Sequence, residues 1–255
     1  MAKMPVIFVG HGSPMNAIED NAYTRKWAEI GQRIKKPEII LSVSAHWVTS
    51  GSKVNNESQP KMVYDMYGFP QELYEVLYQA PGAPAMAGET MKLLNRDVQI
   101  DNSWGIDHGT WSVLCRMFPQ ADIPVFQLSL DHRVSAEAHF QMGTKLAALR
   151  EKGVLIMGSG NIVHNLSRVD FSMAEGYSWA DEFDAYIKAK IVGREFDQVV
   201  NYHLAVDSSE LAFHTTEHYN PLLYVLGASS SDDKLTVFND SCTMGALSMT
   251  GYLFE

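Results

Sequence analysis

Short apolar runs rich in β-branched residues alternate along this chain with stretches whose apolar residues repeat at helical spacing. The clearest runs are residues 6–9, 39–43, 123–128 and 154–157, each about as long as a buried strand. Two more, residues 235–238 and 251–254, lie near the C-terminus. Buried strands that alternate with helices are typical of α/β proteins with a parallel sheet. We therefore predict an α/β fold with a mostly parallel central sheet flanked by helices.

Helix-start signals lie between these runs. Asp107 precedes apolar residues at helical spacing, which predicts a capped helix. Ser178, with Asp181 three residues later, predicts a capping box at the start of a second helix. Asp207 begins a third helical stretch that runs toward Pro221, where a new turn should begin because proline cannot continue a helix interior.

The chain has 255 residues, 46% of them hydrophobic, and it contains no internal repeat or long linker. This predicts a single domain over residues 1–255. The polar segment 49–59 predicts a loop or hairpin, and segments 65–70 and 79–88 predict irregular loops. Loops of this kind often form the mouth of a functional site.

Charge and hydropathy exclude several classes of partner. The chain has 20 Lys and Arg against 30 Asp and Glu, a formal net charge of -10, so it should repel nucleic acids and acidic membrane surfaces. The apolar run at residues 5–9 is shorter than a secretory signal requires, and no segment approaches the roughly 20 apolar residues of a membrane span. We expect a cytoplasmic protein with no nucleic-acid or membrane partner.

Histidines follow three of the predicted strands. His11 follows the first run and Gly10, His46 comes shortly after the second run, and His164 follows the run that ends at residue 157. Ligands bind beyond the carboxyl ends of the strands in open parallel sheets, so these side chains can converge on one crevice. Because neutral imidazole is a preferred ligand of zinc and iron, the placement predicts a metal site. Residues 107–111 and 214–218 supply further histidines.

Residues 214–218 match H-x-x-E-H, in which two histidines one helical turn apart bind zinc and the glutamate acts as a base. This motif makes a zinc-dependent hydrolase an alternative. Two observations oppose it: the terminal Glu255 is the only glutamate after His218, and Pro221 interrupts the region where a regular helix is required. The glycine-rich segments 10–15 and 158–163 both lack the last glycine of G-x-G-x-x-G, which disfavours a dinucleotide site.

Five motifs in sequence order together resemble the class III extradiol ring-cleavage dioxygenase superfamily, in the branch of the 4,5-DOPA dioxygenases. The motifs are residues 10–14 (GHGSP), 44–47 (SAHW), 107–111 (DHGTW), 158–165 (GSGNIVHN) and 217–222 (EHYNPL). Each motif alone is a weak signal, but the ordered set covers most of the chain. The resemblance implies an α/β metalloenzyme.

The resemblance implies that His11, His46 and His218 hold one divalent metal ion. Two threonines follow His214, where the family usually has prolines, so the third ligand is less firmly assigned than the first two. Glu217 is the substitute ligand if His218 points away. More distant relatives use a carboxylate as third ligand, which gives the two-histidine, one-carboxylate face of oxygen-activating iron(II).

The resemblance also implies that His164 acts as acid and base beside the metal, and that it can serve as a fourth ligand when no substrate is bound. His108 matches a pocket histidine that contacts the substrate or oxygen. Aromatic residues near these motifs either bind the substrate or pack in the core. They are Trp47, Tyr219, Tyr67 and Phe69, of which Trp47 and Tyr219 are expected to bind the substrate.

The implied activity is the opening of a catechol-type ring, L-DOPA-like, beside the two hydroxyl-bearing carbons with O2. Iron(II) would support this activity, whereas zinc(II) can occupy the same ligands but has no redox chemistry. The implied partners are a small aromatic diol and O2, and no sequence feature predicts an oligomeric state. Two alternatives remain open, namely the zinc-dependent hydrolase and a non-enzymatic binding protein on the same fold.

Overall fold

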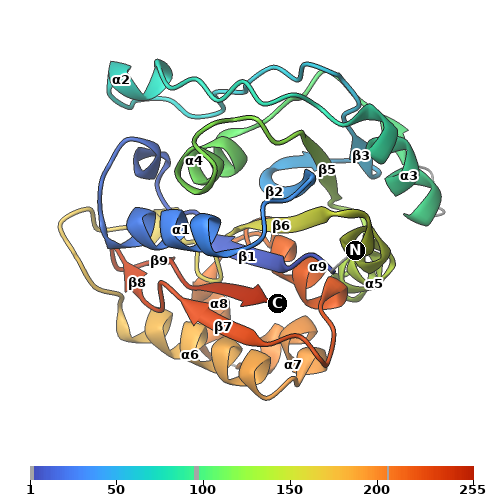
Figure 1. The fold of residues 1–255 in the computed structure, drawn as a ribbon. Helices are drawn as coiled ribbons and strands as arrows, with labels where there is room; N and C mark the ends of the chain where they lie inside the picture. Colours follow the sequence, from blue (N-terminus) through green and yellow to red (C-terminus); the bar gives the residue numbers. More distant parts are fainter. Residues whose placement is uncertain (1–2, 95–97, 206) are drawn as a thin grey trace.

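An eight-stranded sheet runs through the centre of the protein (Figure 1), as seen in a computed structural model that describes residues 3–94, 98–205 and 207–255. Its strands, in chain order, are β1 (Val6–Gly10), β2 (Ile39–Thr49), β3 (Lys53–Val54), β4 (Gln99–Ile100), β5 (Val125–Asp131), β6 (Val154–Gly160), β7 (Leu235–Phe238) and β10 (Gly251–Phe254). Their order across the sheet is β4-β3-β5-β2-β6-β1-β10-β7. A separate hairpin consists of β8 (Cys242–Thr243) and β9 (Leu247–Ser248).

The four central strands β5, β2, β6 and β1 are parallel to one another. Antiparallel pairing occurs toward the two edges, where β10 pairs with β1 and β7, and β3 pairs with β5. The predicted α/β fold with a mostly parallel sheet is therefore confirmed. The parallel arrangement brings the carboxyl ends of β1, β2 and β6 to one edge, which is where the site lies.

Helices cover both faces of the sheet (Figure 1). They are α1 (Ala22–Arg33), α2 (Gln71–Tyr74), α3 (Pro84–Leu94), α4 (His108–Met117), α5 (Ala136–Leu146), α6 (Ser178–Val192), α7 (Phe196–Val200), α8 (Asp207–Ala212) and α9 (Asn220–Ala228). Short 3-10 helices occupy Pro14–Ala17, Ala147–Lys152, Leu166–Arg168 and Tyr202–Ala205. The cluster on one face contains residues of α1 and α4, and the cluster on the other contains residues of α5, α6 and α9.

Alternation along β1 shows how one strand supplies both layers. Val6 and Phe8 belong to the cluster with α5, α6 and α9, whereas Ile7 and Val9 belong to the cluster with α1 and α4. Successive side chains of a strand point to opposite faces, so a fully apolar run is what a sheet covered on both faces requires. This explains why the central strands were visible in the sequence as uninterrupted apolar runs.

Local predictions had mixed outcomes. Asp107 caps α4 as predicted, since its side chain accepts a hydrogen bond from the backbone N–H of Thr110. The capping box predicted at Ser178 was wrong, because Tyr177 is the N-cap of α6 and no side chain caps that end.

The segment 49–59 contains the short strand β3 in addition to loop, and segment 79–88 contains the start of α3. The proline at 221 lies in the first turn of α9, where its missing N–H costs nothing.

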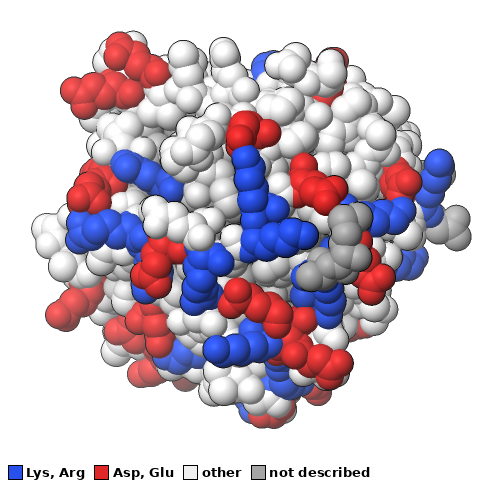
Figure 2. All heavy atoms as spheres, in the orientation of Figure 1, with Lys and Arg blue, Asp and Glu red and all other residues white. Residues whose placement is uncertain are grey.

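Charged side chains of both signs are interspersed on the face drawn in Figure 2, with lysines and arginines lying close to acidic residues. Surface ion pairs of the protein include Lys36 with Asp122 at 2.5 Å and Lys188 with Asp240 at 2.8 Å. Within the described part of the chain, no helix combines the length and the apolar character needed to cross a membrane.

Candidate metal centre

Three histidines from distant parts of the chain meet at the carboxyl edge of the sheet. His11 follows β1, His46 lies in β2, and His218 lies in the turn before α9. One ring nitrogen from each lies within 4.8 Å of the others, and the Nε2 atoms of His11 and His46 are 3.3 Å apart. The pairing of β2 with β5 shifts register between Val43 and Val48, so His46 lies in an irregular segment of its strand. Such irregularities re-aim side chains, often beside functional sites.

The outer nitrogen of His11 is held by a serine at the end of β6. The Nδ1 atom of His11 lies 2.9 Å from Ser159 Oγ, which donates a hydrogen bond to the carbonyl of Gly109. A hydroxyl has one hydrogen, so Ser159 accepts from the Nδ1–H of His11. The Nε2 atom of His11 therefore carries a lone pair and faces His46.

Glycine at position 109 is required by close packing around this group. A Cβ atom there would lie 2.8 Å from both His46 Cδ2 and Ser44 Oγ. Ser44 donates a 2.7 Å hydrogen bond to Asp107, the residue that caps α4. The start of α4, strand β2 and the ring of His46 are thus fixed against one another.

His218 is buried, with 6% of its surface exposed, and neither of its ring nitrogens makes a hydrogen bond among the described residues. The Glu217 carboxylate lies 3.6 Å from its Nδ1 atom. The His218 backbone is held by the residue that follows β6, because the N–H of Asn161 donates to the His218 carbonyl at 2.9 Å. A buried polar atom without a partner costs about 1–3 kcal/mol, so such a group in a native protein calls for a partner. A nitrogen facing two other imidazoles fits a metal ion.

Burial lowers the pKa of His11 and of His218 well below the ordinary value of 6.5, and the neighbouring histidines lower it further. Both rings are therefore neutral at pH 7 and keep a lone pair. Neutral imidazoles are the form that binds zinc and iron. The lowered pKa values and the arrangement of the three rings thus both favour metal binding.

His164 follows the strand β6 and packs face to face on His218, with ring centroids 3.4 Å apart and an interplanar angle of 5°. Burial lowers the pKa of His164 to about 4. The ring is therefore neutral at pH 7 and can accept a proton. Its backbone N–H donates to the Ala212 carbonyl at 2.8 Å, which holds the loop after β6 in place.

Asp65 joins two imidazoles on the other side of the cluster. Its Oδ2 lies 3.1 Å from Nδ1 of His46, and its Oδ1 lies 3.0 Å from Nδ1 of His108. Burial raises the pKa of Asp65, but the hydrogen bonds from His108 and His46 outweigh burial and hold it well below its usual range. Burial also lowers the pKa of His108, against the opposing effect of Asp65. The sequence reasoning did not include Asp65 among the candidate site residues, although Asp65 lines the same cavity as these histidines.

A cavity of about 360 Å³ opens over these histidines. Its inner end is formed by the rings of His11, His46, His108, His164 and His218 together with Asp65. Its remaining lining is largely apolar, and no lysine or arginine is among the residues that line it. The lining includes Pro14, Met66, Tyr67, Phe69, Leu166, Val169, Phe171, Met244 and Leu247. A cavity that is apolar around a few convergent polar groups is typical of a small-molecule site.

Two of the four aromatic candidates lie elsewhere. Tyr67 and Phe69 line the cavity, but Trp47 and Tyr219 do not. Trp47 is buried and stacks on Trp104, with ring centroids 6.4 Å apart. Tyr219 is fully buried and donates a 2.7 Å hydrogen bond to the Val199 carbonyl. Neither residue therefore lines the cavity, and the substrate-binding role expected of Trp47 and Tyr219 gains no support from its lining.

The H-x-x-E-H motif requires a helix, and these residues do not form one. Residues 214–219 form bends and a turn, not a helix, and His214 is exposed and lies 2.9 Å from Ser167 Oγ. Its ring is not in the cluster with His11 and His46. Since two histidines one helical turn apart are what that motif requires, the structure contradicts this basis for a zinc hydrolase.

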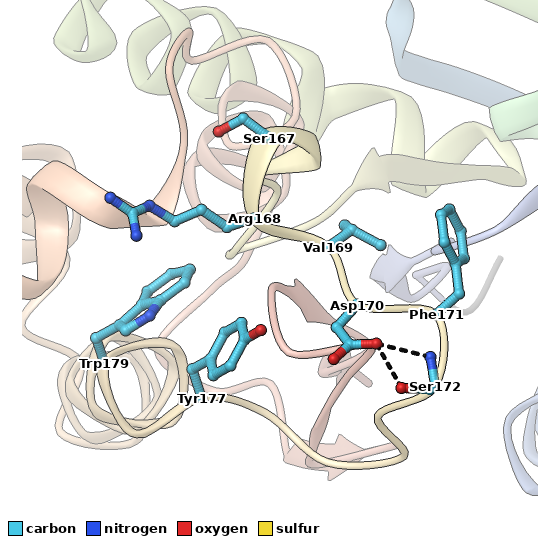
Figure 3. A pocket seen from close by; sticks show the side chains of 8 residues that line it. All are labelled: Ser167, Arg168, Val169, Asp170, Phe171, Ser172, Tyr177 and Trp179. Atoms are coloured by element: carbon cyan, nitrogen blue, oxygen red, sulfur yellow. Dashed lines mark hydrogen bonds between the residues drawn. The ribbon is translucent and has the colours of Figure 1, made fainter.

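A larger hollow of about 860 Å³ lies beside the cavity (Figure 3). Residues 167–172 and the rings of Tyr177 and Trp179 surround it, and Val169 and Phe171 line both spaces. In Figure 3 the Asp170 carboxylate accepts hydrogen bonds from the N–H and hydroxyl of Ser172, at 2.9 and 2.6 Å. No histidine lines this hollow, so the chemistry belongs to the smaller cavity.

Comparison with known proteins agrees with this geometry. Residues 5–255 match the family described as the catalytic LigB subunit of aromatic ring-opening dioxygenase. The chain is 46% identical to a 4,5-DOPA dioxygenase extradiol of Escherichia coli (strain K12), over 97% of this chain and 93% of that protein. It is 35% identical to a 4,5-DOPA dioxygenase extradiol of Beta vulgaris, over 97% of this chain and 95% of that protein.

A crystal structure of an uncharacterized protein from Escherichia coli K12 superposes with a TM-score of 0.87 at 42% identity, covering 99% of this chain and 100% of that one. Fold and site together define a metal-dependent α/β enzyme with a histidine cluster at the carboxyl edge of its sheet. The chain belongs to the LigB family of aromatic ring-opening dioxygenases. The expectation of an extradiol dioxygenase, as opposed to a binding protein, is confirmed.

Proposed function

We propose that His11, His46 and His218 bind one iron(II) ion and that the enzyme opens the ring of a catechol-type diol, such as L-DOPA, with O2. The ligand assignment rests on buried His218. Neither of its ring nitrogens has a hydrogen-bond partner among residues that the structure describes, and one of them lies within 4.8 Å of ring nitrogens of His11 and His46. The substrate class is supported by the names of the relatives in Escherichia coli and Beta vulgaris. A bound iron(II) would supply the redox chemistry that brings the diol and O2 together.

Zinc(II) fits the same donors, because it too prefers imidazole nitrogen. It has no accessible redox change, so a zinc-bound form of this protein would be inactive toward O2. The protein is therefore expected to bind either metal and to turn over with iron alone. Glu217 would substitute only if His218 pointed away. His218 lies in the cluster, and the Glu217 carboxylate accepts a hydrogen bond from the Thr215 hydroxyl and lies 3.6 Å from His218 Nδ1.

His164 would move the proton in this reaction. Its ring is held flat against His218, which places it beside a ligand without being part of the three-nitrogen cluster. A neutral imidazole there can take a proton from a diol hydroxyl and return it later to the substrate, which is general base and then general acid catalysis. His108 also lines the cavity and would contact the bound diol or oxygen.

The aromatic ring of the diol would lie between two loops at the mouth of the cavity. Tyr67 is 91% exposed and Phe171 is 85% exposed, although both line the cavity. Large apolar side chains exposed beside a site are typical of a binding surface for an apolar ligand. Because no lysine or arginine lines the cavity, the charged tail of an amino-acid catechol would project out of this mouth.

Oxygen uptake tests the proposal. The purified protein would be stripped of metal, loaded anaerobically with iron(II) or with zinc(II), and mixed with L-DOPA in an oxygen electrode. We expect oxygen consumption and a yellow semialdehyde product with iron(II) and neither with zinc(II). Absence of uptake after confirmed iron loading would overturn the proposal, and oxygen-independent product formation with zinc would favour a hydrolase.

A further inference from the structure

We propose that Asp65 is a positioning residue that fixes the ring orientation and tautomer of two site histidines at once, the ligand His46 and the pocket residue His108. The inference rests on the proposed function for the role of His46. It concerns a residue outside the five motifs, in the segment 65–70 that was predicted only to be an irregular loop. What carries it is the arrangement of a single carboxylate between two imidazoles.

Each oxygen of Asp65 faces one ring. Oδ2 lies 3.1 Å from Nδ1 of His46, and Oδ1 lies 3.0 Å from Nδ1 of His108. An ionised carboxylate can only accept hydrogen bonds, so at these distances it favours the tautomer with hydrogen on Nδ1 in both rings. The Nε2 atoms of both rings are then the ones left free, and that of His46 is the atom 3.3 Å from His11 Nε2.

The carboxylate is itself held in place. Oδ1 also accepts a 3.0 Å hydrogen bond from the backbone N–H of His108. The loop that carries Asp65 pairs with the segment before α4, through a 2.8 Å hydrogen bond from the N–H of Val63 to the Ile106 carbonyl. The indole of Trp111 donates to the Val63 carbonyl at 3.0 Å. A rigid acceptor of this kind orients a ligand imidazole and raises its basicity.

Asp65, His46 and His108 also lie close enough together to hold a cation of their own, since one ligand atom from each falls within 4.8 Å of the others. Both Asp65 oxygens lie at hydrogen-bond distance from an imidazole Nδ1 atom, however. The contacts therefore favour positioning of one metal site over the formation of a second one. The number of metal ions bound per chain separates the two.

Asp65→Asn is the informative variant because it changes the hydrogen-bonding pattern and keeps the shape. The amide oxygen should stay with the backbone N–H of His108, which leaves the amide NH2 facing His46. An NH2 group can only donate, so it would force His46 into the tautomer with hydrogen on Nε2, which cannot bind a metal. Asp65→Ala removes the acceptor without forcing that tautomer. The asparagine variant should therefore bind metal more weakly than the alanine variant.

Zinc affinity is measured by competition with a chelator for the wild type, Asp65→Asn, Asp65→Ala and the control Asp101→Asn. Asp101 is a comparably shielded carboxylate, 17% exposed against 13% for Asp65, and it pairs with Lys53 instead of a histidine. We expect one zinc per wild-type chain, a 10–100-fold loss of affinity in Asp65→Asn, a smaller loss in Asp65→Ala and no change in the control. Equal affinity of wild type and Asp65→Asn, or two zinc ions per wild-type chain with the second lost on Asp65→Ala, would overturn the proposal.

A second measurement does not depend on the folding of any variant. Long-range proton–nitrogen correlation spectra of the zinc-loaded wild type report which nitrogen of each imidazole carries hydrogen. We expect the Nδ1–H tautomer for both His46 and His108, and an Nε2–H tautomer at either ring would contradict the inference. Neither readout requires turnover, so a protein that shows both expected results but opens no catechol ring would overturn the proposed function alone.

Discussion

The two ends of the central strands treat buried polar groups in opposite ways. Before β1 and β6, the fully buried guanidinium of Arg150 donates to the Met4 carbonyl at 2.6 Å and forms a two-point pair with Asp233, at 2.6 and 3.0 Å. Asp233 also accepts from Lys3 and from the N–H of Ser230. At the carboxyl end, neither ring nitrogen of buried His218 has a hydrogen-bond partner in the described part of the chain. The buried ion pair at one end is fully hydrogen-bonded within the chain, whereas the His218 nitrogens at the other end are left for a ligand.

This difference separates groups that hold the fold from groups that are kept for chemistry. Removing one member of a buried, fully hydrogen-bonded ion pair lowers stability strongly, because the other charge is then left buried and unpaired. A buried nitrogen without a partner lowers stability until something binds it. The protein therefore carries a stability cost at the site, which a metal ion would offset because binding to the folded state stabilises it.

The largest expected effect is on catalysis, and it distinguishes the role of His164 from that of the three clustered histidines. His164→Ala should lower kcat/KM for L-DOPA about 100- to 10,000-fold, because a positioned general acid and base is lost. Its metal content should stay at the wild-type level, since the His11, His46 and His218 nitrogens form the cluster without it. Oxygen uptake and metal analysis of the iron-loaded variant provide the check, with His203→Ala at an exposed position as control. Retained turnover would contradict the acid and base assignment.

The end of the sheet that contains the Arg150–Asp233 ion pair is tested by breaking that pair. Arg150→Met should lower the free energy of unfolding by about 3–5 kcal/mol, because Asp233 keeps its burial and loses its partner. Urea denaturation of the metal-free proteins measures the change. Metal content should be unaffected. A loss below about 1 kcal/mol would show that the two ends do not differ as the contacts suggest.

Asp184 provides an intermediate case, hydrogen-bonded but without an ion-pair partner among the described residues. It accepts from Ser248 and Thr250, at 2.5 and 2.8 Å, and burial raises its pKa from 3.8 to about 6. The folded state keeps the proton after the unfolded state has lost it, so stability falls as pH rises from about 4 to 6. The difference corresponds to about 3 kcal/mol.

Asp184→Asn should remove this pH dependence. Relative to wild type, the variant should gain about 3 kcal/mol of unfolding free energy between pH 4 and pH 7, measured by urea denaturation at each pH. A parallel pair of stability curves across that range would show that Asp184 is ionised in the folded protein.

The smallest expected effect has the opposite sign from the Arg150 variant. His218→Leu replaces the unpartnered imidazole by an apolar group of similar size, so the metal-free variant should be more stable than the metal-free wild type by about 1 kcal/mol. Thermal or urea unfolding of both metal-free proteins measures it. Destabilisation by several kcal/mol would mean that His218 has a structural partner in solution.

The sequence predicted those parts of the structure that depend on local pattern. Apolar runs identified the central strands, and the capping pattern of Asp107 identified the start of α4. Strand-end placement brought His11 and His46 to one edge, and the His218 motif added the third ring. The short edge strands β3 and β4 were missed because two residues carry no periodicity.

Contacts between distant segments were outside the reach of such patterns. Asp65 lies 43 residues before His108 in an irregular loop, and its role appears only when the loop is placed against α4. Trp47 and Tyr219 adjoin site histidines in sequence but point into the interior. Proximity along the chain predicts the element that a residue occupies, whereas the direction of its side chain depends on backbone geometry.

Metal stoichiometry tests the central claim that the unpartnered imidazoles are kept for a metal ion. Equilibrium dialysis against zinc(II) would count the ions bound by wild type, His218→Leu and Arg150→Met. The account predicts one ion per chain for wild type and for Arg150→Met, and none for His218→Leu at zinc concentrations that saturate the wild type. Full binding by His218→Leu would contradict it.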